Sequence, residues 1–157
     1  MTPTPISHAI PAGFSELKLR PAGYLQANGP FYGRLDDGAL TIGLRIEPRH
    51  CNAAGMAHGG MLLTLVDVAL TVASNFNART QRFLPTMNVT CDFIAGAPLG
   101  SWVQVSTEVL RVSGRHVFSQ VMMTDDAGTL LARASGILVL RGDPDPALSG
   151  DDLLPKP

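Results

Sequence analysis

One segment of the chain, residues 59–77, carries apolar residues on almost every side of a helical wheel. A helix of this kind must be buried over most of its surface. It therefore predicts a central helix that the rest of the chain covers. The few polar positions recur every three or four residues, which predicts a narrow stripe along one side of the helix. This stripe consists of Thr64, Asp67, Thr71 and Ser74.

Most of the remaining chain has the pattern of β-strands, in which every second residue is apolar. Short polar or glycine-containing breaks at residues 36–38, 113–114 and 125–128 predict antiparallel hairpins. A short helix is also expected over Ser15–Leu19. The predicted strands cover residues 31–35, 39–47, 86–94, 102–112, 115–124 and 129–141.

This order of elements predicts the architecture. One apolar helix, preceded by a hairpin and followed by a strand meander, is typical of an α+β fold in which a sheet wraps the helix. The outer face of such a sheet needs solvent or a covering layer. Because many outward-facing positions are small or uncharged, we expect a partner subunit to supply part of that cover.

The length of 157 residues fits a single domain. Residues 1–12 are rich in proline, and residues 142–157 combine Asp, Pro and Ser without periodicity. Both ends are predicted to be flexible. The folded domain is therefore expected to span residues 13–141.

Composition excludes several classes of partner. The formal charge of −1 and the absence of any Lys/Arg run give no reason to expect nucleic acid or a membrane surface. The two cysteines, Cys51 and Cys91, form no disulfide framework. The N-terminus has no signal-peptide pattern, and the apolar run Met61–Ala73 is interrupted by Asp67 and too short to cross a bilayer. We therefore expect a cytoplasmic protein.

Common catalytic motifs are absent from the sequence. It contains no GxSxG elbow, HExxH helix, P-loop or GxGxxG turn. His50, Cys51 and His58 lie close together, but their spacing matches no usual zinc pattern. No metal site is therefore predicted.

Two consecutive glycines, Gly59 and Gly60, stand at the predicted start of the central helix. The first N–H groups of a helix have no partner within it, and the helix dipole makes this end positive. Glycine also allows another group to approach the backbone closely. These features suit an oxygen of a polarised carbonyl. A tight turn that needs positive φ would explain the glycines equally well.

Asp67 is a second candidate on the same helix. A carboxylate on an apolar helix is costly to bury without a partner, so Asp67 either faces water or serves as a base or nucleophile in a pocket. It lies about 12 Å from Gly59 along the helix axis, at 1.5 Å per residue. One reacting carbon cannot contact both groups of the same chain. If both act in one reaction, the site must cross a two-fold interface.

The sequence resembles a known family at these positions. The HGG motif at residues 58–60, with Asp67 nine residues after His58, resembles the PaaI-type acyl-CoA thioesterases of the hotdog superfamily. The stretches TMNVTCDF at 86–93, SGR at 113–115 and residues 132–140 are also similar to strands and a turn of that family. The resemblance implies a hotdog fold, in which a curved antiparallel sheet wraps one long central helix. It also implies hydrolysis of an acyl-coenzyme A thioester.

The resemblance assigns a role to each motif residue. It implies that Asp67 is the general base or nucleophile and that the Gly59 N–H polarises the thioester carbonyl across a dimer interface. It further implies that Asn52 places the substrate or water, that His58 supports the loop and that Thr86 orients the attacking water. The family builds its sites across dimers and commonly pairs them, so a homodimer at least, and a homotetramer by resemblance, is expected.

Substrate contacts are expected at Gly60, Ser113 and Arg115, the last of these toward the coenzyme A phosphates. Exposed arginines near turns are also often only solvated. No cofactor is expected beyond coenzyme A, which belongs to the substrate. The acyl group stays open, with residues of the type of Met61, Leu62, Leu65 and Phe83 as candidates for its pocket.

Two alternative functions share this fold. An acyl-thioester hydratase or dehydratase needs a histidine free to move protons at the substrate carbons, whereas His58 lies in the glycine turn. A non-catalytic acyl-CoA-binding protein has no need of a carboxylate beside a thioester carbonyl. The combination of Asn52, Asp67 and Thr86 therefore favours hydrolysis.

Overall fold

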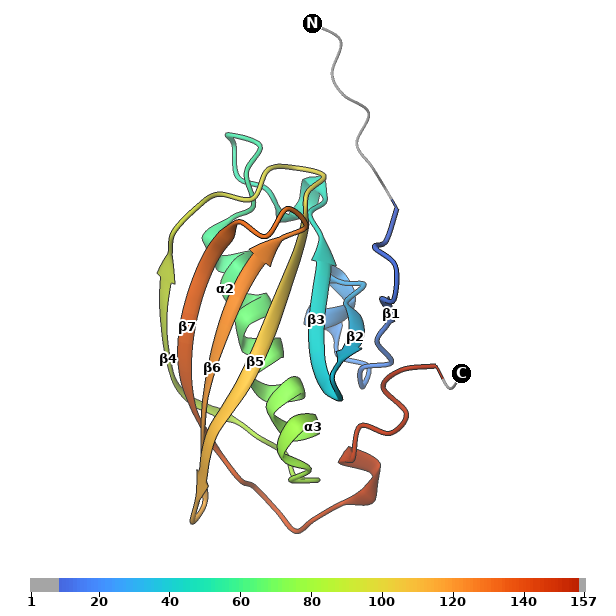
Figure 1. Cartoon of the computed structure of the whole chain (residues 1–157), viewed down its shortest axis with the longest axis vertical. Helices are drawn as coiled ribbons and strands as arrows, with labels where there is room; N and C mark the ends of the chain where they lie inside the picture. The colour runs from blue at the N-terminus through green and yellow to red at the C-terminus, as the bar shows by residue number, and fades with distance from the viewer. Residues whose placement is uncertain (1–8, 156–157) are drawn as a thin grey trace, which may run out of the picture.

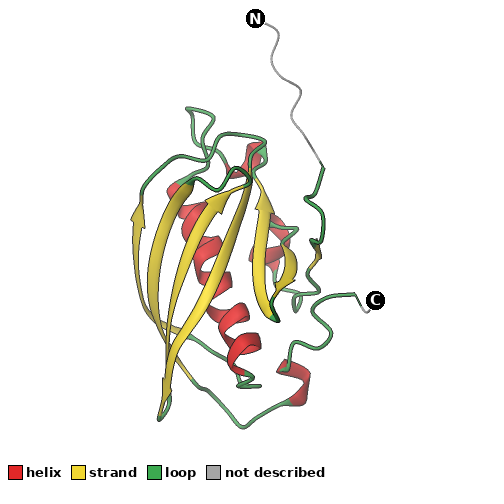
Figure 2. Ribbon diagram, viewed as in Figure 1, coloured by secondary structure: helices red, strands yellow, loops and turns green. Residues whose placement is uncertain are grey.

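The computed structural model of the chain describes residues 9–155. A seven-stranded antiparallel sheet, in the order β1-β2-β3-β5-β6-β7-β4, curves around one long helix (Figures 1 and 2). The strands are β1 (Ser15–Glu16), β2 (Tyr32–Asp36), β3 (Ala39–Arg45), β4 (Thr86–Phe93), β5 (Trp102–Ser113), β6 (His116–Asp125) and β7 (Leu130–Val139). The predicted α+β architecture is confirmed.

The central helix is a continuous run of three pieces. The α-helix α2 (Gly59–Val68), the π-helical turn η2 (Ala69–Ala73) and the α-helix α3 (Ser74–Ala78) follow one another without a break. The short helices α1 (Gly23–Asn28), η1 (Pro48–His50) and η3 (Pro146–Leu148) lie outside it. The central helix packs on the concave face of the sheet, where its apolar side chains form the core (Figure 1). Its fully buried members are Leu65, Val66, Ala69, Leu70 and Ala73.

This helix is longer than the apolar run that the sequence suggested. It covers 20 residues, Gly59–Ala78, and by length and composition alone it is long and apolar enough to cross a membrane. The expectation from Met61–Ala73 that the segment is too short is therefore wrong. The core helices of soluble proteins meet the same criterion, and half of the most apolar part of this helix is buried within the fold.

The π-helical turn corrects the predicted polar stripe. A π-turn contains one residue more than an α-turn, so the residues after it are rotated by about 100° around the axis. Ser74 follows the turn and is fully buried, with its hydroxyl 2.8 Å from that of Ser119 on β6. Thr64, Asp67 and Thr71 remain only partly buried. The stripe thus ends at Thr71, and Ser74 faces the sheet.

The strand β3 is buried on both faces, although its pattern predicted one buried face. Its outer face is covered by Trp102 and by Phe14 from the N-terminal segment, whose rings lie 4.9 Å apart. Gly43 is required here because a Cβ would lie 2.2 Å from the Trp102 indole. Arg45 then stacks on the same indole at 5.3 Å.

Two local predictions are corrected by the structure. The helix expected over Ser15–Leu19 is absent: the strand β1 lies there instead, because Leu17 N–H donates to Phe31 O at 2.8 Å beside β2. The apolar face of β4 is only partly buried within this chain, since β4 is an edge strand of the sheet. Met87 and Phe93 on that strand are 60% and 52% exposed.

Candidate active site

Asp67 and Thr86 lie together beside the central helix. Asp67 is on α2 and half-buried, and Thr86 is the first residue of β4. The Thr86 hydroxyl donates a hydrogen bond of 2.7 Å to Oδ1 of the Asp67 carboxylate. The other carboxylate oxygen of Asp67, Oδ2, has no hydrogen-bond partner within residues 9–155 and is therefore open to a substrate or a water.

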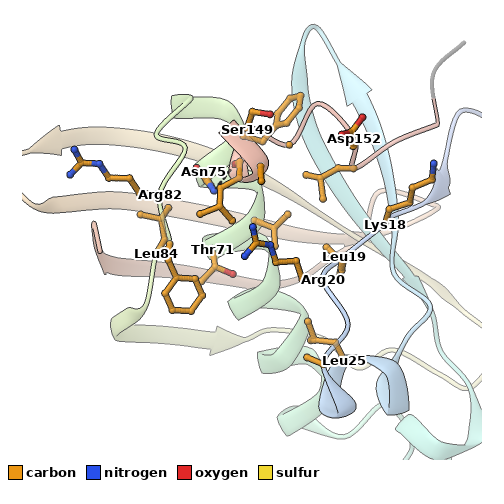
Figure 3. Close-up of a pocket in the computed structure, with 18 of the residues that line it drawn as sticks. Lys18, Leu19, Arg20, Leu25, Thr71, Asn75, Arg82, Leu84, Ser149 and Asp152 are labelled. Atoms are coloured by element: carbon orange, nitrogen blue, oxygen red, sulfur yellow. Dashed lines mark hydrogen bonds between the residues drawn. The ribbon is translucent and has the colours of Figure 1, made fainter. Parts of the chain in front are cut away.

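The Asp67–Thr86 pair borders a cavity of about 580 Å³, a volume in the usual range for a small-molecule site. Figure 3 shows its labelled side chains coming from four stretches: the N-terminal segment, the central helix, the loop before β4 and the C-terminal segment. The main apolar lining consists of Leu19, Leu25, Val72, Phe76, Leu84 and Leu148. The arrangement places a carboxylate at the wall of a mainly apolar pocket, whose lining also includes the cationic side chains Lys18, Arg20 and Arg82.

The glycine turn lies at the N-terminal end of the central helix, and side chains of the turn and of the preceding loop hold it in place. His58 caps α2, with its Nδ1 accepting the Gly60 N–H at 3.0 Å. The Asn52 side chain closes the preceding loop by accepting the N–H groups of Ala54 and Met56 at 2.9 and 3.3 Å. Within residues 9–155 the Gly59 N–H donates to no acceptor, so it is the donor left for an external oxygen.

The single chain does not bring all the predicted site residues together. Asn52, His58 and Gly59 do not line the cavity that contains Asp67. Asp67 lies eight positions beyond Gly59 on one helix, which corresponds to about 12 Å. A site that uses both Gly59 and Asp67 must therefore take one of them from a second chain.

The predicted binding residues at the β5–β6 turn lie at the end of the sheet where β4 begins. Ser113 and Arg115 are exposed and do not line the cavity. The Arg115 carbonyl accepts from Leu140, and Pro85, next to Thr86, accepts from Val139. Only β7 lies between these two positions, so their backbones are about 10 Å apart at the usual strand spacing.

The pocket lining differs from the sequence prediction. Met61, Leu62 and Leu65 are buried in the core and do not reach the cavity, whereas Phe83 does. The N-terminal stretch 18–25 and the C-terminal stretch 146–153 contribute lining that sequence reasoning missed. The only feature of these two stretches that could have indicated a pocket lining was a few isolated leucines within polar sequence that has no periodicity.

His50 has a structural role at the base of the loop that contains Asn52. It is 2% exposed, and its carbonyl accepts the His58 N–H at 2.7 Å. Its Nδ1 accepts the Glu47 N–H, so the neutral ring carries its proton on Nε2, which lies 3.0 Å from Asn28 O. Burial, followed by the charge of Arg49, lowers the pKa of His50 below its ordinary 6.5. The histidine is therefore held neutral at the base of the Asn52 loop.

This lowered pKa predicts a pH-dependent stability. The unfolded chain binds a proton at His50 below pH 6.5, whereas the folded chain binds it only at lower pH. Stability is therefore lost as the pH falls below 6.5, by at most about 1.4 kcal/mol per pH unit for this group. Urea unfolding of the parent and of His50→Gln at about pH 7.5 and pH 5 checks this. The variant should lose less stability on acidification; an equal loss would contradict the assignment.

His50, Cys51 and His58 are not gathered into a group of potential metal ligands. Across residues 9–155 no three His, Cys, Asp or Glu side chains converge as metal ligands would. Cys51 and Cys91 are free thiols, and burial raises the pKa of each. Their raised pKa values make both thiols poor candidates for a nucleophile at neutral pH.

Comparison with known proteins places the chain in a family. The sequence pattern of the thioesterase superfamily matches residues 54–132. A candidate esterase of Pseudomonas aeruginosa is 36% identical over 132 residues, which cover 83% of this chain and 97% of that protein. The human acyl-coenzyme A thioesterase 13 is 33% identical over 101 residues, covering 61% of this chain and 69% of that protein.

Solved structures show the same fold at lower identity. The PaaI protein from the phenylacetic acid degradation operon of E. coli has a TM-score of 0.69 and 18% identity, covering 78% of this chain and 87% of that one. A hypothetical thioesterase of Streptococcus pneumoniae, solved with coenzyme A, has a TM-score of 0.66 and 17% identity, covering 73% and 91%. The hotdog fold implied by the motif residues is thus confirmed, and the chain belongs to the thioesterase superfamily.

Proposed function

We propose that this protein hydrolyses an acyl-coenzyme A thioester to the free acid and coenzyme A. The observation that carries the proposal is the Thr86–Asp67 hydrogen bond at the wall of an apolar cavity, in a chain of the thioesterase superfamily. A carboxylate in this position can take a proton from water beside a bound acyl group. A relative named as an acyl-coenzyme A thioesterase supports this choice of substrate.

The reaction follows from these groups. The Asp67 carboxylate accepts a proton from a water positioned by Thr86, and the water oxygen adds to the thioester carbon. The Gly59 N–H of a second subunit donates to the carbonyl oxygen as negative charge develops there. The carbon–sulfur bond then breaks, and the proton held by Asp67 passes to the departing sulfur. Direct attack by Asp67, followed by hydrolysis of the resulting anhydride, uses the same geometry.

Four further residues complete the proposed site. Asn52 and His58 hold the loop that presents Gly59, through the hydrogen bonds already described. Arg115 is proposed to meet the phosphates of coenzyme A, since its turn lies at the end of the sheet where Thr86 begins β4. The Gly60 N–H is already bonded to His58, so Gly60 contributes by its lack of a side chain rather than as a donor.

Release of free thiol from a panel of acyl-CoAs tests the function directly. A hydrolase liberates coenzyme A from at least one of them. A hydratase or dehydratase changes the acyl carbons and releases no thiol. A pure binding protein binds acyl-CoA without any reaction. Binding without thiol release across the panel would therefore overturn the proposal.

The site is proposed to be shared between two subunits. The unpaired edge of β4, with Met87 and Phe93 exposed, offers a surface that a second copy would cover. The distance of about 12 Å between Gly59 and Asp67 along one helix requires such a partner if both act on one thioester. A dimer is the minimum assembly, and pairing of dimers follows the family resemblance.

Subunit mixing provides a sharp test of this sharing. Dimers of Asp67→Asn and dimers of Gly59→Val should each be nearly inactive. After refolding together, half of the dimers are mixed, and one of the two sites in each mixed dimer has both parent residues. Activity should therefore return to about a quarter of the parent value. Failure to regain activity in verified mixed dimers, or an active monomer in light scattering, would contradict the shared site.

A further inference from the structure

The C-terminal segment, residues 145–153, forms one wall of the cavity beside Asp67. Lining residues come from almost every position of this segment, from Pro146 to Leu153. Figure 1 shows the chain leaving β7 and passing across the end of the central helix to reach the N-terminal segment. We call residues 145–153 the C-terminal strap.

Backbone hydrogen bonds and one ion pair hold the strap in place. Asp145 N–H donates to Gln81 O at 2.7 Å, and Lys18 N–H donates to Leu153 O at 2.9 Å. Asp145 also pairs with Arg20 at 3.6 Å. The strap is thus attached to the loop before β4 at one end and to the N-terminal segment at the other.

The strap meets the central helix at Asn75 and Phe76. The Asn75 side chain donates to Leu148 O at 3.1 Å. Gly150, at φ +82°, brings the strap so close to Phe76 that a Cβ would lie 2.7 Å from its ring. Asn75 is eight residues beyond Asp67, so at the α-helical rise its backbone lies about 12 Å farther along the helix axis.

Between the carboxylate and the strap, the cavity follows one side of the helix. Thr71, Val72 and Phe76 line it from the helix, Leu84 lines it from the loop before β4 and Leu148 lines it from the strap. The amide of Asn75 is already engaged, because it donates to the strap and accepts from Thr80 at 2.5 Å. The pantetheine arm of coenzyme A contains amides that need hydrogen-bond partners, whereas an alkyl chain needs none. This stretch therefore suits the acyl chain.

We propose that the C-terminal strap closes the acyl end of the pocket and limits the substrate to acyl chains of about ten carbons. This inference rests on the proposed thioesterase function and adds the class of substrate to it. An extended chain advances about 1.2 Å per bond, since three backbone bonds span 3.3–3.6 Å. A distance of about 12 Å thus holds about ten bonds. Leu148 and Leu153 are the residues of the strap that set this limit.

The test is thiol release from a series of straight-chain acyl-CoAs, from acetyl to palmitoyl. For the parent, kcat/KM should rise by up to about fourfold for each methylene that the pocket buries. The rise should stop near decanoyl, and palmitoyl-CoA should be a poor substrate. Leu148→Trp fills the cavity and should move the optimum to shorter chains, while Leu148→Ala should move it to longer ones. Leu35→Trp, on an exposed position of β2 outside the cavity, is the matched control and should not move it.

A chain that ends at Arg141 removes the strap entirely. It should raise kcat/KM for palmitoyl-CoA relative to octanoyl-CoA by at least about tenfold, because the far wall is gone. If that chain fails to fold, the opposite shifts of the two Leu148 variants decide the question. Equal effects of the Leu148 variants on every chain length would overturn the strap proposal while leaving thioester hydrolysis intact. A parent that releases no thiol from any acyl-CoA would overturn the proposed function itself.

Discussion

Replacing Asp67 with asparagine is expected to lower thioester hydrolysis by about 10²–10⁴-fold, the usual contribution of a positioned acid–base group. The amide is nearly the same shape as the carboxylate, and its Oδ1 can still accept the Thr86 hydroxyl that lies 2.7 Å away. It can neither take a proton from water nor attack as an anion. The fold and the affinity for substrate should therefore persist while kcat falls.

Steady-state thiol-release kinetics measure the fall in kcat. Thermal unfolding of the same preparation checks that the fold persists. Asp36→Asn is the matched control, since Asp36 is an exposed carboxylate on β2 paired with Arg34 outside the cavity. It should retain the parent rate. An Asp67→Asn variant that releases thiol at the parent rate would show that this carboxylate only completes a polar stripe.

The main elements of the fold were predictable because the spacing of apolar residues along the sequence reflects which faces of a helix or strand are buried. The helix that is apolar on almost all sides and the six predicted strands appear in the structure within a few residues of their expected bounds. The exceptions arise where burial depends on features that the local spacing of apolar residues does not show. Ser74 turns to the sheet because a π-turn shifts the helix register. Phe14 and Trp102 bury the second face of β3 from distant parts of the sequence.

The candidate site was predictable only in part. The motif resemblance pointed to Asp67 and Thr86, and the structure places them within hydrogen-bonding distance. The pocket beside them was not predictable, because apolar residues of the core and of the pocket look alike in sequence. Met61 is buried in the core, whereas Leu148 lines the cavity. The strap that carries Leu148 is held largely by backbone hydrogen bonds, which leave no side-chain periodicity.

Replacing Gly59 with alanine separates stabilisation of the transition state from simple binding. Gly59 has no positive φ, and an added Cβ would lie 3.7 Å from the Phe93 ring, an ordinary contact. The folded chain should therefore accept the alanine. A methyl group beside the N–H would instead crowd the thioester carbonyl and move it away from this donor. Loss of one such donor typically costs about 10²–10³ in turnover, which is the expected fall in kcat.

Binding should respond much less than turnover. The donor acts mainly on charge that develops in the transition state, so a non-hydrolysable acyl-CoA analogue should bind within about tenfold of the parent affinity. Calorimetry with the analogue and thiol-release kinetics on the same variant measure the two quantities. Gly23→Ala is the matched control, because Gly23 also begins a helix and a Cβ there meets nothing within 4 Å. Equal losses of binding and turnover in Gly59→Ala would indicate a blocked pocket. A selective loss of turnover would identify the Gly59 N–H as the donor to the developing oxyanion.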